Sequence, residues 1–169
     1  PPFYAAEIGI EIAQVGFIFF LARGFDAIID PIIGNLSDRT RSKWGRRKPW
    51  IFFGVPLLLV SFYAFMQPPG GVGIPYLAAV AFLFYVALTL VSIPYLSWGA
   101  ELARDYSGRT RVASFREAAG ICGTVFATAL PLLVLPALLD GEPQVRDILA
   151  VLAGTVIGIM VIATPLALK

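Results

Sequence analysis

Two aspartates and an arginine interrupt a mostly apolar stretch and share one side of the helix that this stretch predicts. Arg23, Asp26 and Asp30 lie within residues 12–36, and positions three and four apart fall on one helical face. Each charge in hydrocarbon costs at least ~2.5–3.5 kcal/mol, so three of them favour a water-lined path over a lipid-facing wall. Two carboxylates beside a guanidinium could bind a cation.

The composition places this helix in a membrane. Apolar residues make up 58% of the 169 and charged residues only 14%, with a mean hydropathy of +0.80, whereas soluble domains have roughly 25% charged residues. We therefore expect an all-α polytopic membrane protein. A transmembrane helix needs about 20 mostly apolar residues, which predicts five spans and two loops on one side: spans 12–36, 49–67, 74–98, 114–138 and 148–168, loops 37–48 and 99–113.

The basic residues predict the orientation of these spans. One side of the membrane receives nearly all of them, namely Arg39, Arg41, Lys43, Arg46, Arg47, Lys48, Arg104, Arg109, Arg111 and the final Lys169. The loops on the other side carry only Arg146. By the positive-inside rule the basic loops are cytoplasmic. An odd number of spans, the first starting outside, predicts that an earlier helix is missing and that the chain is a piece of a longer protein.

The residue content argues against an enzyme. Histidine is absent, which excludes imidazole metal sites and His-based catalysis. The single Cys122 can form no internal disulfide. No nucleophile and base pair or metal cluster is visible, and we expect no cofactor. The basic residues 39–48 could suggest nucleic acid, but their position between two spans favours orientation and contact with anionic membrane lipid.

The order of residues in this basic segment is not explained by charge alone. Asp38 ends the helix that contains the first predicted span and can accept hydrogen bonds from backbone N–H groups or pair with a guanidinium. Gly34 allows close approach of another helix, and Gly45 allows a tight turn.

Two separated segments resemble one family. The first segment contains Asp26-Ala-Ile-Ile-Asp30-Pro31, Gly34, Asp38-Arg39 and Gly45-Arg46-Arg47. The second contains Ile93-Pro94-Tyr95, Gly99-Ala100-Glu101, Arg109-Thr110-Arg111 and Phe115-Arg116. Together they resemble the glycoside–pentoside–hexuronide:cation symporters of the major facilitator superfamily. This group contains the melibiose permease. The resemblance covers essentially the whole chain and aligns it with helices two to six of twelve, so the first helix and the C-terminal half would be missing.

The resemblance implies Na⁺- or H⁺-coupled symport of a sugar or glycoside by alternating access in the bacterial inner membrane. In the family, aspartates matching Asp26 and Asp30 bind the coupling cation, Na⁺ in sodium-coupled members, and a hydroxyl matching Thr89 contributes to that site. Alternatively, the aspartates cap the helix end or pair with the basic loop, and Thr89 bonds its own backbone.

The resemblance also implies substrate contacts. Arg116 matches an arginine that contacts sugar hydroxyls, although it could instead be a counter-ion to the aspartates, and we place Arg23 and Ser92 beside the substrate as well. Ser92 stands where the melibiose permease has a sugar-binding aspartate, and Leu96 replaces an aromatic residue that stacks on sugar. The substrate could therefore be another glycoside, a pentoside, a uronate or an amphiphile such as a lysolipid.

Charged residues of the two basic loops, with two glycines in or beside the first loop, form the expected gating group. In this superfamily such ion-pair networks stabilise the outward-facing state, while solvated loop charges are the alternative reading. The expected group comprises Gly34, Asp38, Arg39, Gly45, Arg46, Glu101, Asp105, Arg109 and Arg111. A membrane sensor or scaffold with the same fold is a rival function, but the intact Asp26 and Asp30 pair argues against it.

Overall fold

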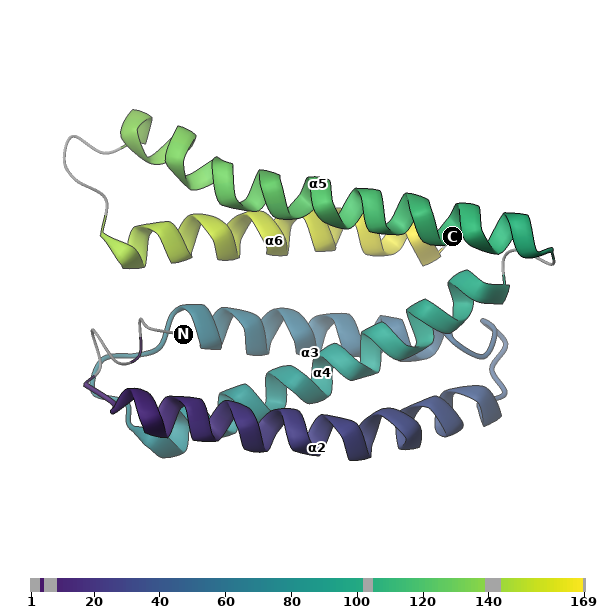
Figure 1. Cartoon of the computed structure of the whole chain (residues 1–169), viewed down its shortest axis with the longest axis horizontal. Coiled ribbons are helices and arrows are strands. Elements are labelled where there is room, and N and C mark those ends of the chain that lie inside the picture. The colour runs from purple at the N-terminus through teal and green to yellow at the C-terminus, as the bar shows by residue number, and fades with distance from the viewer. Residues whose placement is uncertain (1–3, 5–8, 102–104, 139–143, 169) are drawn as a thin grey trace.

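The protein is described here by a computed structural model covering residue 4 and residues 9–101, 105–138 and 144–168. These residues form helices and connecting turns, with no strand among them. The helices are α2 (Ile12–Arg39), α3 (Lys48–Met66), α4 (Ile74–Glu101), α5 (Tyr106–Leu138) and α6 (Val145–Leu168) (Figure 1). The predicted all-α class is confirmed. Two residues of the expected basic side, Arg104 and Lys169, lie outside the described part of the chain.

Four of the helices, α2, α3, α4 and α6, are long and apolar enough to cross a membrane. Exposed large apolar side chains occur along their length, among them Phe20, Phe53 and Ile162. A helix that is apolar all round suits a lipid environment. Helix α5 is the longest, and the side chains of its last turns lie outside the described residues. Its membrane crossing stays a prediction.

Helix α4 organises the first part of the bundle. It runs obliquely between α2 and α3 and contacts both, while α5 and α6 lie side by side and α6 contacts α3 (Figure 1). The chain alternates in direction, so α2, α4 and α6 end at the same end of the bundle at which α3 and α5 begin. We call this the basic end, because it holds residues 40–47 between α2 and α3.

Helices α3 and α4 pack tightly against each other at Gly54. A Cβ atom placed on Gly54 would lie 2.8 Å from Val91 Cγ2 and 3.2 Å from Leu90 Cβ, distances at which something must shift. At Gly34, where we predicted the close approach, the nearest atom is Ile93 Cγ2 at an ordinary 3.7 Å. Gly34 therefore does lie against α4, but its contact is looser than that of Gly54.

Three helices extend at least three residues beyond the predicted spans at the basic end. Helix α2 continues to Arg39, past residue 36, and α4 continues to Glu101, past residue 98. Helix α5 begins at Tyr106, inside the predicted loop 99–113. A run free of charge marks the hydrocarbon layer, but a helix continues into water wherever its termini are satisfied. The connection between α4 and α5 is therefore shorter than we predicted.

An aromatic cluster fixes the opposite end of the bundle. The Tyr4 hydroxyl donates a hydrogen bond of 2.8 Å to the Phe65 carbonyl, and the two rings lie 5.6 Å apart. The Phe65 ring also stacks on Phe84 of α4 at 5.8 Å. Such ring pairs contribute about 0.5–1.5 kcal/mol beyond burial of their area. Helices α3 and α4 are thus held at this end as well as at Gly54.

The contact at Gly54 predicts a local stability effect. Gly54→Ala should destabilise the bundle by about 1–3 kcal/mol, because the added methyl group meets Val91 and Leu90 in a packed interface. Thermal unfolding of the detergent-solubilised protein measures this. Gly16→Ala, with open space around its Cβ, is the matched control. Combining Gly54→Ala with Val91→Ala should restore much of the loss; failure of that rescue would contradict the packing assignment.

Candidate functional site

Two helices meet at a polar centre. Asp26 and Asp30 lie one turn apart on α2 and face Thr89 of α4, whose Oγ1 is 2.6 Å from Asp26 Oδ1 and 3.0 Å from Asp30 Oδ1. Thr89 is 4% exposed. Together with Arg23, these residues form what we call the central polar site. The structure therefore brings together the three residues that we predicted to bind a cation.

The Thr89 hydroxyl is shared between two acceptors. It has a single hydrogen, so it can donate fully to only one carboxylate at a time. The hydroxyl oxygen then faces the lone pairs of the other carboxylate, an unfavourable contact unless a proton or a cation lies between them. The backbone hydrogen bond considered as an alternative for Thr89 is not its contact here. The arrangement can thus accept one positive charge.

Arg23 supplies part of the compensating charge. Its Nη1 lies 3.6 Å from Asp26 Oδ2. The Arg23 side chain is 72% exposed and that of Asp26 only 13%, so the guanidinium occupies the open side of the carboxylate. Asp30 has no ion pair among the residues described. The alternative that both aspartates pair with the basic loop is therefore not observed.

The predicted substrate residues lie in different settings. Ser92 follows Thr89 by three residues on α4, on the same helical face, and is half-buried. Arg116, on α5, forms its ion pair with the neighbouring Glu117 at 3.0 Å. It does not act as a counter-ion to the aspartates in this conformation; Arg23 holds that position. The structure brings Ser92 near the central polar site by register, but it shows no contact between Arg116 and the site.

An arginine outside our predicted set connects the helix ends at the basic end. Arg47 Nη2 lies 2.8 Å from both Asp38 Oδ1 and Glu101 Oε1, and Arg47 Nε lies 3.2 Å from Glu101 Oε1. Arg47 is 9% exposed, and its Nη1 has no hydrogen-bond partner among the residues that the structure describes. One guanidinium therefore joins the end of α2, the start of α3 and the end of α4. We call Asp38, Arg47 and Glu101 the end network.

No signal in the sequence separates Arg47 from Arg46, because the difference depends on where α3 begins. Arg47 directly precedes the first residue of α3. Its side chain therefore lies at the start of this helix, close to the ends of α2 and α4. Arg46, which we predicted instead, is exposed. Adjacent residues point in different directions, so at most one of the two arginines could be buried in the network.

The other predicted gating residues have varied contacts. Arg39, Arg46 and Asp38 help to line an open hollow of about 440 Å³ at the basic end. Gly45 adopts φ +98° in a turn closed by its N–H donating to the Ser42 carbonyl at 3.1 Å. That left-handed conformation strains any residue with a Cβ. Arg111 is exposed and makes no ion pair within the described ranges.

Asp105 caps α5. Its carboxylate accepts a hydrogen bond from the Ser107 hydroxyl and one of 3.2 Å from the Gly108 N–H. These bonds, chiefly that from Ser107, together with the charge of Arg109, hold the pKa of Asp105 below its usual range. We had placed Asp105 in an ion-pair network; its main contacts are instead with the first turn of its own helix, as expected of an N-cap.

The comparisons with known proteins identify the family. The profile of the family described as "MFS/sugar transport protein" matches residues 1–168. The chain therefore belongs to this family, and the resemblance to the glycoside–pentoside–hexuronide:cation symporters is confirmed. An uncharacterized symporter of Synechocystis is 38% identical over 84% of this chain and 28% of its own length.

Two further relatives have named substrates. The isoprimeverose transporter of Lactiplantibacillus pentosus is 31% identical over 79% of this chain and 28% of its own length. The sodium-dependent lysophosphatidylcholine symporter 1 of Xenopus tropicalis is 30% identical over 77% of this chain and 24% of its own length. The chain thus spans less than a third of these relatives. They are transporters rather than enzymes, which confirms that expectation, and the chain is part of an integral membrane protein.

The end network predicts unequal roles for two adjacent arginines. Arg47→Gln should lower the stability of the protein by about 1–3 kcal/mol, because Asp38 and Glu101 lose their shared donor. Arg46→Gln removes the same charge from the neighbouring exposed position and should have an effect within about 0.5 kcal/mol. Thermal unfolding of both variants measures the difference. Equal losses would contradict the assignment of Arg47 as the connecting residue.

The cap at Asp105 predicts a pH dependence confined to one helix end. Because the folded-state pKa is lowered, the cap stabilises the start of α5 above the ordinary aspartate pKa of about 3.9 and is lost as pH falls through the lower folded value. Amide exchange of Ser107 to Arg109, corrected for intrinsic rates, should show protection at neutral pH that disappears at strongly acid pH. Asp105→Ala should lack this protection at every pH, and Asp147→Ala serves as the control. A first turn equally protected in Asp105→Ala would contradict the cap.

Proposed function

We propose that the chain is part of a secondary transporter in which Asp26, Asp30 and Thr89 bind the coupling cation, Na⁺ or H⁺. The observation that carries this proposal is the position of Thr89 Oγ1 within hydrogen-bond distance of both carboxylates. Oxygen donors of this kind suit a hard cation, and the shared hydroxyl equally suits a carboxyl that carries a proton. The two ions would then compete for one place.

We propose a sugar or glycoside as the substrate. The family description and the isoprimeverose transporter support this class. Ser92 and Arg23 flank the proposed cation site, and Arg116 offers a planar set of donors that suits adjacent hydroxyl groups. Because Arg116 is held by Glu117 here, its contact with substrate would require it to leave that partner.

The end network gives the proposal a conformational element. Arg47, Asp38 and Glu101 join the ends of α2 and α4, the same helices that carry the proposed cation site. We propose that the basic end faces the cytoplasm of a bacterial inner membrane and that breaking this network accompanies its opening. In alternating access, two halves rock about a central site. The first helix and the second half of the transporter would complete that site.

A lysolipid or other amphiphile is the second candidate substrate. The lysophosphatidylcholine symporter of Xenopus tropicalis supports it, and Ser92 and Leu96 stand where the melibiose permease, which the chain resembles, has a carboxylate and a stacking ring. A cavity for such a substrate would need more apolar surface. Uptake of labelled sugars and of labelled lysophosphatidylcholine, measured side by side in proteoliposomes of the full-length protein, separates the two classes.

The proposed cation site predicts the behaviour of three variants. Asp26→Asn and Asp30→Asn should each abolish gradient-driven uptake, because the remaining carboxylate cannot offset the dehydration of a cation. Thr89→Val, which keeps the shape but removes the hydroxyl, should weaken cation dependence by about tenfold, and Thr89→Ser should retain it. The measurement is initial uptake by the full-length protein against Na⁺ concentration and pH.

The amount of each variant that is inserted and folded in the membrane serves as the control. All should reach the membrane at normal levels, and Asp147→Asn, a carboxylate at the start of α6, should transport normally. Normal cation dependence in both Asp26→Asn and Asp30→Asn would overturn the assigned site.

A further inference from the structure

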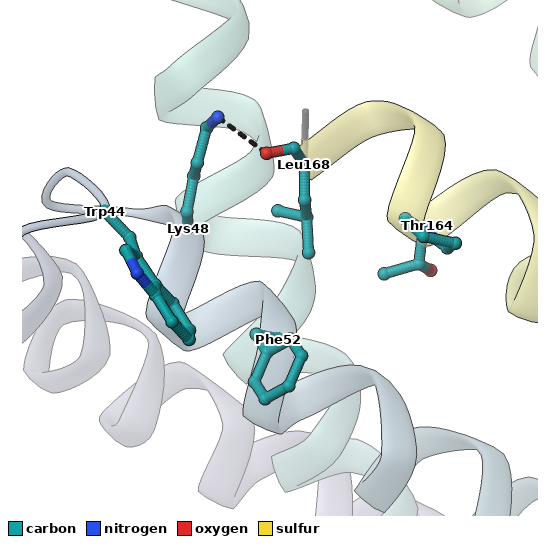
Figure 2. Close-up of a pocket in the computed structure, with 6 residues that line it drawn as sticks. Trp44, Lys48, Phe52, Thr164 and Leu168 are labelled. Atoms are coloured by element: carbon teal, nitrogen blue, oxygen red, sulfur yellow. Dashed lines mark hydrogen bonds between the residues drawn. The ribbon is translucent and has the colours of Figure 1, made fainter.

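A second cavity lies at the basic end, between the first turns of α3 and the last turns of α6. It measures about 320 Å³ and is lined by Trp44, Lys48, Phe52, Thr164, Pro165 and Leu168 (Figure 2). None of these residues belongs to the central polar site. Small-molecule pockets begin at about 300 Å³. The cavity is therefore large enough for part of a ligand and separate from the site described above.

The walls of this cavity are almost entirely hydrocarbon. The rings of Trp44 and Phe52 pack edge to face with their centroids 5.7 Å apart, and in Figure 2 they stand across the cavity from Thr164 and Leu168. Trp44 is 62% exposed and Phe52 is 46% exposed. Exposed aromatic side chains beside an aliphatic wall favour an apolar ligand over water.

The position of the cavity places it where hydrocarbon meets lipid headgroups. Helix α3 begins at Lys48, and no charge follows until Glu101. Helix α6 ends at Leu168 on the same side. Tryptophan and lysine are the residues that gather at this depth, with the ring in the interface and the ammonium towards the headgroups.

Lys48, which lines the cavity, has an ammonium group with more hydrogen-bond donors than its described contacts use. Lys48 Nζ donates a hydrogen bond of 2.7 Å to the Leu168 carbonyl and lies 5.6 Å from the centre of the Trp98 ring. An ammonium has three donors, and Lys48 forms no ion pair with a carboxylate in the described ranges. The neighbouring segment 39–47 adds further positive charge. This end of the cavity is thus complementary to an anion.

We propose that the α3–α6 cavity binds one anionic phospholipid. An acyl chain lies against Phe52, Pro165 and Leu168, and a phosphate oxygen accepts a hydrogen bond from Lys48 Nζ. A lipid whose headgroup carries its own cation, such as phosphatidylcholine, is disfavoured because that cation approaches Lys48 and the basic segment. The bound lipid fills the gap between α3 and α6 and steadies the end of α3 that carries Arg47.

Quenching of Trp44 fluorescence tests the site. The full-length protein is reconstituted in phosphatidylcholine vesicles that contain increasing fractions of phosphatidylglycerol with brominated acyl chains, and the signal of Trp44 is taken as the difference from a Trp44→Phe variant. We expect quenching that saturates at a low fraction of phosphatidylglycerol and is absent when the bromine is carried by phosphatidylcholine. Lys48→Gln should raise the half-saturating fraction by at least about fivefold.

Two comparisons separate a built site from general attraction to the membrane. Lys43→Gln removes an equal charge from the same segment but not from the cavity, and should shift half-saturation less than about twofold. Thr164→Phe fills the cavity and should lower the quenching plateau. Equal effects of Lys48→Gln and Lys43→Gln, or equal quenching by both brominated lipids, would overturn the proposal. Absence of quenching, as expected if another part of the protein occupies the cavity, would overturn it too.

Discussion

The arrangement of the first helices depends on how two carboxylates are accommodated between apolar surfaces. Asp26 and Asp30 lie on a helix that is otherwise suited to lipid, and their charges cannot remain there without polar partners. The partners are the Thr89 hydroxyl, at 2.6 and 3.0 Å, and the Arg23 guanidinium, at 3.6 Å from Asp26. Helix α4 must therefore cross α2 at this level. The short contact at Gly54 then brings α3 against the other side of α4.

The same helices carry the polar contacts at the basic end. Arg47 binds Asp38 at the end of α2 and Glu101 at the end of α4. A change in the angle between α2 and α4 alters both the distances around Thr89 and the geometry at Arg47, because helices move largely as rigid elements. The charge at the proposed cation site and the contacts of the end network can therefore influence each other through the angle between α2 and α4. Proposed coupling of this kind needs only the two helices and no chain of intermediate residues.

Much of the arrangement could be predicted from sequence, and the failures have physical causes. The helices follow from long, mostly apolar runs, and the aspartates stand out because charge is rare in such runs. The sequence could not distinguish Arg47 from Arg46, since the choice depends on where α3 begins relative to its neighbours. Nor could it single out Gly54 as the tightest contact among the described glycines, because that depends on which helix faces which glycine. The start of α5 was missed because a polar segment capped by Asp105 reads as a loop.

Infrared difference spectroscopy tests the central claim, that Asp26 and Asp30 are the ligands of the coupling cation, most directly. Spectra of the full-length protein in lipid are recorded on adding Na⁺ at constant pH and, separately, on acidification. The account predicts carboxylate stretching changes with at least one of the two ions, and their loss in the Asp26→Asn, Asp30→Asn double variant. Carboxylate changes of unaltered size in that variant would contradict it, because the ion would then bind at other groups.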